Sequence, residues 1–221
     1  MKKALKITTF IIAILISAII FYLLFTKNTF IDDKIYKVLV KYITNTNTSI
    51  AKIFTFLGST LFITILCVLS LIPKKTRFSV VINTLIAVGI SQALKRIVRR
   101  ARPIGVALIE ETGFSFPSGH SMVGFAFYGF IIYLIYKSKL NKTLKVLLIT
   151  LFSLLIISIG LSRIYLGVHH ATDVIGGFAL GYICLYIFIE FIYKKFFNKV
   201  IWYVIIKNER IDLTISYFEV K

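Results

Sequence analysis

The run ITTFIIAILISAIIFYLLF, residues Ile7–Phe25, decides the class of fold because its 19 residues include no charged side chain. Roughly 20 apolar residues cross a bilayer as an α-helix, and in lipid the backbone must satisfy its own hydrogen bonds. A cleaved signal peptide would have an apolar core of about 7–15 residues followed by a small-residue cleavage site. This run is longer and ends in FYLLFTKN, so we predict an uncleaved membrane anchor.

Similar apolar runs recur along the chain of 221 residues, of which 58% are hydrophobic. The mean hydropathy is +0.88, whereas ordinary soluble domains are only about 45–50% apolar. We therefore predict an all-α polytopic membrane protein built as a six-helix transmembrane bundle. The five further spans are expected at Ile53–Ile72, Phe78–Leu94, from near His120 to Tyr136, Val146–Leu161 and Val174–Ile189.

The six spans define an expected domain over residues 1–193, followed by a tail over residues 194–221. In the tail, VIWYVII and IDLTISYF flank a polar KNER, which favours a short hairpin on the membrane surface. The loop 26–52 contains DDKIYKVLVKYI, with apolar positions near helical spacing. An ordinary connecting helix is the simpler interpretation, and a helix lying in the membrane interface is the alternative. Cys67 and Cys184 lie in apolar spans and are interpreted as small core residues.

The net charge of +18 first suggests nucleic acid. The basic residues instead punctuate apolar spans, so we predict a lipid bilayer as the partner and no nucleic acid. With a cytoplasmic N-terminus, that side carries 16 Lys and Arg and the other side 11. Without the cluster 95–102 and Arg163, the counts are 16 and 5. The positive-inside rule then predicts that both termini are cytoplasmic.

The segment KRIVRRARP, Lys95–Pro103, places five cations at the outer end of the third span. Spacings of four and seven would put Lys95, Arg99 and Arg102 on one helical face. Like charges this close repel one another, so an anionic partner is expected. Arginine offers a planar fork to phosphate oxygens and lysine a point charge. A lipid-headgroup anchor is the structural alternative.

The segment FPSGHS, Phe116–Ser121, precedes the fourth apolar helix. Ser118 is a favourable N-cap and Gly119 lets the backbone approach a ligand closely. Free amides at a helix N-terminus bind anions, and His120 would lie in the first turn beside such an anion. A capping turn with an incidental histidine is the alternative.

The segment SRIYLGVHHATD, Ser162–Asp173, places Arg163 at the outer end of the fifth span. On a helix, Asp173 can reach His169 at a spacing of four or His170 at a spacing of three. An aspartate partner fixes the tautomer of a histidine and stabilises its cation. The predicted topology brings all three segments to one face, where cations, amides and histidines suit phosphoryl transfer.

These residues together resemble the type 2 phosphatidic acid phosphatase family, whose fold is shared with vanadium haloperoxidases. The family pattern is Lys, six residues, Arg-Pro; then Pro-Ser-Gly-His; then Ser-Arg, five residues, His, three residues, Asp. This chain matches it with Lys95, Arg102-Pro103, Pro117-Ser118-Gly119-His120, Ser162-Arg163, His169 and Asp173. The stretch LIEETGFSFPSGHSM also resembles the bacterial branch that acts on undecaprenyl pyrophosphate and phosphatidylglycerophosphate.

The resemblance implies a role for each matching residue. Phosphate would be bound by Lys95, Arg102, Ser118, Gly119 and Arg163. His169 would attack phosphorus to give a phosphohistidine, Asp173 would orient it, and His120 would protonate the leaving oxygen before water hydrolyses the intermediate. This route needs no metal and no cofactor.

The expected activity is therefore that of a metal-independent lipid phosphatase in a bacterial plasma membrane, with its active site at the outer membrane–water interface. Undecaprenyl pyrophosphate, phosphatidylglycerophosphate and phosphatidic acid are the candidate substrates. A lipid phosphotransferase, a vanadate-binding haloperoxidase-like protein and a non-catalytic lipid-binding protein are the alternatives.

Overall fold

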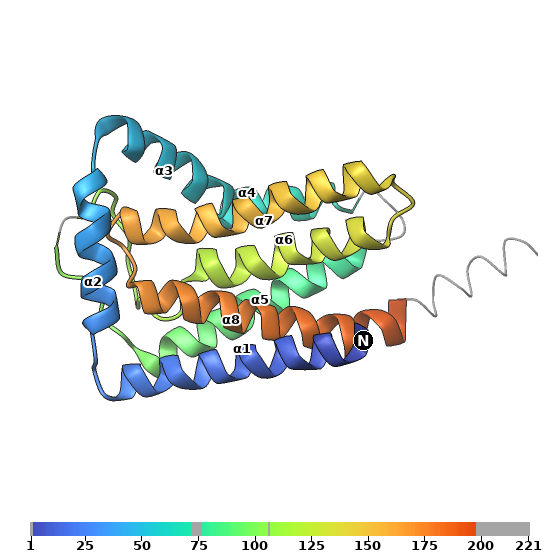
Figure 1. Cartoon of the computed structure of the whole chain (residues 1–221), viewed down its shortest axis with the longest axis horizontal. Helices are drawn as coiled ribbons and strands as arrows, with labels where there is room; N and C mark the ends of the chain where they lie inside the picture. Colours follow the sequence, from blue (N-terminus) through green and yellow to red (C-terminus); the bar gives the residue numbers. More distant parts are fainter. Residues whose placement is uncertain (1, 72–76, 106, 198–221) are drawn as a thin grey trace, which may run out of the picture.

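The computed structural model describes residues 2–71, 77–105 and 107–197, which form helices and loops without a strand. The long helices run along one common direction and form a bundle (Figure 1). The elements are α1 (Lys2–Phe25), α2 (Phe30–Leu39), the 3-10 turn Val40–Tyr42, α3 (Asn45–Leu57), α4 (Thr60–Leu69), α5 (Arg77–Val98), α6 (Gly119–Lys137), α7 (Lys142–Tyr165), α8 (Ala171–Ile187) and the π-helical segment Phe188–Phe197.

The helix ends follow from local capping chemistry. Ser118 caps α6 by accepting a hydrogen bond from the backbone amide of Ser121, and Asn141 caps α7 by accepting one from Leu144. The helix α6 is central to the fold, and its Phe127, Tyr128 and Phe130 are almost completely buried. By contrast, α7 exposes a stripe of large apolar side chains, namely Leu147, Leu151, Leu154, Ile157 and Leu161. Such a stripe is expected on a helix that faces lipid.

The prediction of an all-α membrane bundle is confirmed. Five of the described helices are long and apolar enough to span a membrane, and a bent pair makes a sixth span if it is counted as one. The first and the third to sixth predicted spans correspond to α1, α5, α6, α7 and α8. The hairpin predicted within the tail lies outside the described residues. Residues 194–197, at the start of the tail, belong to the π-helical segment.

The second predicted span, Ile53–Ile72, was wrong as a single helix. The chain breaks between α3 and α4, which are bent by 45°. Ser59 caps α4 by accepting a hydrogen bond from the Phe62 amide, and Gly58 forms the C-cap of α3. A Cβ on Gly58 would lie 2.5 Å from Ile159 Cγ2 and 3.3 Å from His120 Cδ2. The break therefore lets α3 and α4 approach α7 and the site closely.

The loop 26–52 forms α2, the 3-10 turn Val40–Tyr42 and most of α3. In Figure 1, α2 crosses one end of the bundle at a steep angle to the long helices. The N-terminus and the α6–α7 turn lie at the opposite end (Figure 1). The loops 99–118 and 166–170, which carry most of the predicted site, lie at the α2 end.

Candidate active site

The three predicted segments meet at the α2 end of the bundle. The Ser118 amide donates to the carbonyl oxygen of Asp173 at 3.1 Å, which joins the second segment to the third. Arg102 Nη1 donates to the Val168 carbonyl at 2.7 Å and lies 3.4 Å from His169 Nε2. These contacts join the first segment to the third. A Cβ on Gly119 would lie 4.0 Å from Lys95 Cε, so the first and second segments also adjoin.

The expectation that Lys95, Arg99 and Arg102 share a helical face was wrong. The helix α5 ends at Val98, and Arg99 has a φ of 50°, in the left-handed region. Pro103 disfavours helical backbone at Arg102, so the chain has left the helix before that residue. Arg102 instead reaches the site from the loop, where Nη2 donates to the Thr112 carbonyl at 2.7 Å.

Arg163 lies at the end of α7 with only 1% of its surface exposed. Its Nη1 donates to Thr55 Oγ1 at 2.5 Å, and its Nη2 donates to the Glu111 carboxylate. Its Nε is buried without a hydrogen-bond partner among the described residues. A buried arginine with an open donor is suited to hold an additional oxygen atom.

Glu111 is a site residue that lies outside the three predicted segments. Its carboxylate contacts Arg163 and lies 3.8 Å from Arg102 Nη2. Burial disfavours its ionised form, but the two guanidinium groups outweigh burial and hold the pKa of Glu111 below its usual value. The carboxylate thus lies between two of the three predicted phosphate-binding cations. Its place in the quoted stretch LIEETGFSFPSGHSM, close before the second segment, was the available signal.

Ser118, Gly119 and His120 form the start of α6. The Ser118 hydroxyl oxygen accepts hydrogen bonds from the Ser121 amide at 3.4 Å and from Ser121 Oγ at 2.9 Å. The serine is fully buried, so its hydroxyl has a capping role in this structure. Gly119 and His120 line a pocket that also contains His169.

The structure brings His169 together with Asp173. His169 Nδ1 lies 3.5 Å from Asp173 Oδ2, and the Ser115 hydroxyl donates to the same carboxylate oxygen. Because α8 begins at Ala171, His169 precedes the helix, and the predicted spacing along one helical face does not apply. Arginine can only donate, so a hydrogen bond from Arg102 requires an unprotonated His169 Nε2.

His169 is 3% exposed. Burial lowers its pKa to about 4, although the nearby Asp173 carboxylate acts in the opposite direction. The imidazole is therefore neutral near pH 7, which is the form required of a nitrogen nucleophile.

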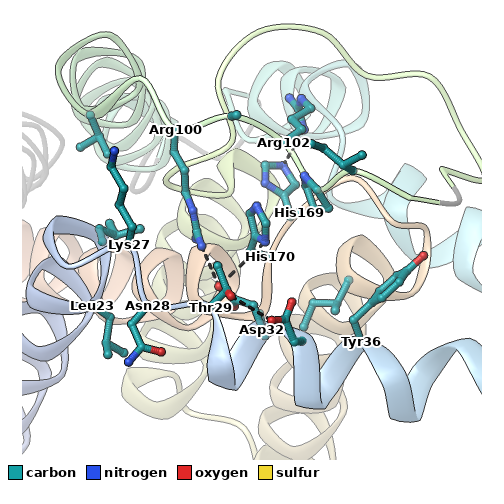
Figure 2. Close-up of a pocket in the computed structure, with 18 of the residues that line it drawn as sticks. Leu23, Lys27, Asn28, Thr29, Asp32, Tyr36, Arg100, Arg102, His169 and His170 are labelled. Atoms are coloured by element: carbon teal, nitrogen blue, oxygen red, sulfur yellow. Dashed lines mark hydrogen bonds and ion pairs between the residues drawn. The ribbon is translucent and has the colours of Figure 1, made fainter.

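His170 is turned to a different partner. Its backbone amide donates to Asp173 Oδ2 at 2.9 Å, while its ring nitrogen Nδ1 lies 3.9 Å from Asp32 Oδ2 on α2. Figure 2 shows the imidazole of His170 above Asp32, and His169 beside Arg102. The helical spacings left both histidines possible as partners of Asp173, and in the structure only the His169 ring adjoins that carboxylate.

A pocket of about 420 Å³ leads to these residues from between α4 and α5. Its polar end contains Lys95, Arg102, Glu111, Gly119, His120 and His169. The remainder is mostly apolar, with Ile63, Cys67, Val68, Leu71, Val81, Leu85, Val88 and Val123 among its lining residues. The pocket therefore combines an anion-binding end with an apolar channel, as a phosphorylated lipid requires.

Within residues 2–71, 77–105 and 107–197, no three His, Cys, Asp or Glu side chains gather as metal ligands would. The absence of a metal and of a cofactor from the reaction stays a prediction.

A family model described as the PAP2 superfamily matches residues 76–197. Phosphatidylglycerophosphatase B of Bacillus subtilis (strain 168) is 39% identical over 113 residues, which cover 50% of this chain and 53% of that relative. The alignment thus spans about half the length of this curated relative.

Two solved structures resemble the fold. A transmembrane PAP2 type phosphatidylglycerolphosphate phosphatase from Bacillus subtilis has a TM-score of 0.73 and 27% identity, with 86% of this chain and 96% of that chain covered. LpxE of Aquifex aeolicus has a TM-score of 0.59 and 22% identity, with 72% of this chain and 94% of that chain covered. At this identity, the second likeness shows the fold alone.

Proposed function

The chain belongs to the PAP2 superfamily, and from this premise we propose that it is an integral membrane phosphatase that releases phosphate from a lipid. The pocket between α4 and α5 is the observation that carries this proposal. Its apolar walls suit acyl or prenyl chains, and its polar end holds two cations, Lys95 and Arg102, beside a neutral histidine. A soluble phosphate ester would have no use for the apolar walls.

In the proposed reaction, Lys95, Arg102 and Arg163 hold the phosphoryl oxygens, with the amide of Gly119 at the start of α6. His169 Nε2 forms the bond to phosphorus as the bond to the leaving oxygen breaks, and His120 gives that oxygen a proton. Water then attacks the phosphohistidine and releases inorganic phosphate. Asp173 keeps Nδ1 of His169 protonated, which leaves Nε2 free to attack.

We propose phosphatidylglycerophosphate as the first substrate to test, because the relative with 39% identity is named phosphatidylglycerophosphatase B. Phosphatidic acid and undecaprenyl pyrophosphate present the same terminal phosphate on an apolar chain. We further propose that the protein resides in a bacterial plasma membrane with the α2 end facing outward, as the distribution of Lys and Arg supports.

Phosphate release from these three lipids tests the proposal, with purified protein in mixed micelles and excess chelator. We expect turnover in chelator, because three cations already face the phosphate. His169→Ala should abolish it, as removal of a nucleophile lowers turnover by up to roughly a millionfold. His170→Ala is the matched variant, and it should retain activity within about tenfold, or 1.4 kcal/mol in the barrier.

Each element of the proposal has an outcome that contradicts it. Release no faster than in His169→Ala on any of the lipids would exclude a phosphatase of this type. Activity restored only by added magnesium would exclude the metal-free route. An inactive His170→Ala beside an active His169→Ala would move the nucleophile by one residue.

A further inference from the structure

Arg100 bridges two buried carboxylates at the α2 end of the bundle. Its Nη1 donates to Asp173 Oδ1 at 2.6 Å, and its Nη2 donates to Asp32 Oδ2 at 2.6 Å. Asp173 has 0% of its surface exposed and Asp32 has 3%. Figure 2 shows the guanidinium extending from the loop toward Asp32 and the start of α8. A planar fork can join two carboxylates in this way, whereas a lysine ammonium is a single point.

Asp32 also fixes the first turn of α8. Its Oδ1 accepts a hydrogen bond from the Thr172 amide at 2.8 Å, and its Oδ2 accepts one from Thr172 Oγ1 at 2.9 Å. Asp32 thus connects α2 with the residue that directly precedes Asp173. The Arg100 backbone contributes as well, because its carbonyl accepts the Ser115 amide at 2.8 Å.

The charges in this network depend on one another. Without Arg100, two carboxylates would be buried close together with one cation fewer, and a buried charge without its partner is costly. Without Asp32, the full positive charge of Arg100 would act on Asp173 and weaken the interaction of Asp173 with His169. Neither residue lines the α4–α5 pocket, although both line a second cavity of about 650 Å³ that also contains Arg102 and His169. Both terminal nitrogens of Arg100 are already paired with carboxylates, so its guanidinium is engaged within the network.

We propose that Arg100 and Asp32 are positioning residues for the His169–Asp173 pair. Arg100 fixes the Asp173 carboxylate so that Oδ2 faces His169 Nδ1. Asp32 balances the charge of Arg100, so that Asp173 keeps its negative charge available to the histidine. This role rests on the proposed function, in which His169 is the nucleophile.

Several charged groups act on His169 besides this network. Asp173 and the Ser115 hydroxyl lie on its Nδ1 side, and Arg102 adjoins Nε2. The cation Arg163 disfavours the imidazolium, and Glu111 and His120 also interact with this ring electrostatically. None of these groups is itself substituted when Arg100 or Asp32 is changed, so a shift in the titration of His169 reports the network.

Arg100 and Asp32 carry opposite charges, so their removal should shift the titration of His169 in opposite directions. Arg100→Gln removes a positive charge near the pair and should raise the pKa of His169. Asp32→Asn removes a negative charge, keeps one of the two acceptor oxygens and should lower the pKa of His169. Each displacement should be about one pH unit, as for a charge near a titrating group. A role confined to packing would not displace the pKa in opposite directions.

Nuclear magnetic resonance can follow the histidines directly, because the chain has only three. The titration is measured on the full chain in nanodiscs, with the imidazole Cε1 labelled. It needs no substrate, so its result does not depend on whether the proposed function is correct. Arg96→Gln and Asp33→Asn are matched controls, since both are exposed neighbours with the same change of charge. They should leave the pKa of His169 at its wild-type value. The proposal would be overturned if Arg100→Gln and Asp32→Asn displaced the pKa of His169 in the same direction, or if neither displaced it.

Phosphate release supplies the second arm. Arg100→Lys keeps the charge but cannot bridge both carboxylates, so kcat should fall by about a hundredfold while KM changes little. The pKa of His169 should stay near its wild-type value in this variant. Full kcat in Arg100→Lys would overturn the positioning role. If Arg100→Gln does not fold, the isosteric Asp32→Asn still decides the question, because its predicted displacement is downward.

Discussion

At the scale of single residues, Glu111 holds a carboxylate where the proposed reaction needs a phosphate. The contacts of Glu111 with Arg163 and Arg102 neutralise part of the cationic end of the pocket. Its side chain is 32% exposed and belongs to the loop 99–118, so it can leave more readily than a core residue. We therefore expect a bound phosphate to compete with this carboxylate for the guanidinium groups of Arg163 and Arg102.

Glu111→Gln should therefore increase the affinity for inorganic phosphate. The neutral amide no longer competes with an anion for the two guanidinium groups, and we expect the inhibition constant to fall roughly tenfold, or about 1.4 kcal/mol. Product inhibition of phosphate release measures this constant. Glu110→Gln is the matched control, since Glu110 is an exposed neighbour outside the α4–α5 pocket. Equal or weaker phosphate binding in Glu111→Gln would mean that the carboxylate holds the arginines in place.

The motifs predicted contacts between residues of the same segment, such as His169 and Asp173. They did not indicate Asp32, which lies far from the motifs in sequence. The histidine and aspartate are only four residues apart, so their contact could be expected before the geometry was known. Asp32 is 68 residues from Arg100 and 140 from Thr172. It is also one of two adjacent aspartates on a short helix. A local pattern could not indicate which aspartate faces inward.

At the scale of secondary-structure elements, the break between α3 and α4 brings part of a predicted span to the site. Thr55 on α3 accepts the hydrogen bond from Arg163, and Thr60 and Ile63 on α4 line the pocket. A straight helix through Gly58 could not satisfy both arrangements, because the two helices differ in direction by 45°. Apolar residues continue on both sides of the break, so hydropathy predicted one span. Ser59 as an N-cap was the local signal for two.

Gly58→Ala should destabilise the protein by about 1–3 kcal/mol, the usual cost of overpacking. Its new methyl group would lie 2.5 Å from Ile159 Cγ2, and its 3.3 Å approach to His120 should lower kcat as well. Gly89→Ala on α5 is the control, because a Cβ there meets nothing within 4 Å. Because Gly89 lies in the interior of α5, Gly89→Ala should be more stable than the wild type by about 0.5–1 kcal/mol. Thermal unfolding in detergent measures the stability of both variants. An unfolding midpoint of Gly58→Ala equal to that of the wild type would contradict the steric role of Gly58.

At the scale of the whole molecule, the two ends of the bundle have different chemistry. The α2 end collects the buried ion pairs of Arg100 and Arg163, whereas the opposite end holds the N-terminus and the α6–α7 turn (Figure 1). The sequence could predict that the three motifs share one end, because each follows or precedes an apolar run. The crossing of α2 over that end depended on contacts between distant segments.

The orientation of the bundle can be tested with single cysteines at its two ends. In a variant without Cys67 and Cys184, Ala107→Cys lies in the exposed loop near the site, and Lys139→Cys lies in the α6–α7 turn. An impermeant maleimide on intact cells should label position 107 and reach position 139 only after permeabilisation, because the positive-inside rule puts the turn in the cytoplasm. The reverse pattern would place the active site in the cytoplasm.

The network around Arg100 also has a consequence for the time course of biosynthesis. Asp32 leaves the ribosome first and Arg100 follows, and Thr172 comes 140 residues after Asp32. At about 5–20 residues per second, this interval lasts roughly 7–28 s. During this time, α2 has been made but the helix that it anchors has not. The proposed active site can therefore be completed only after α8 has been made, and we expect a nascent chain without α8 to be inactive however long its earlier helices have been inserted.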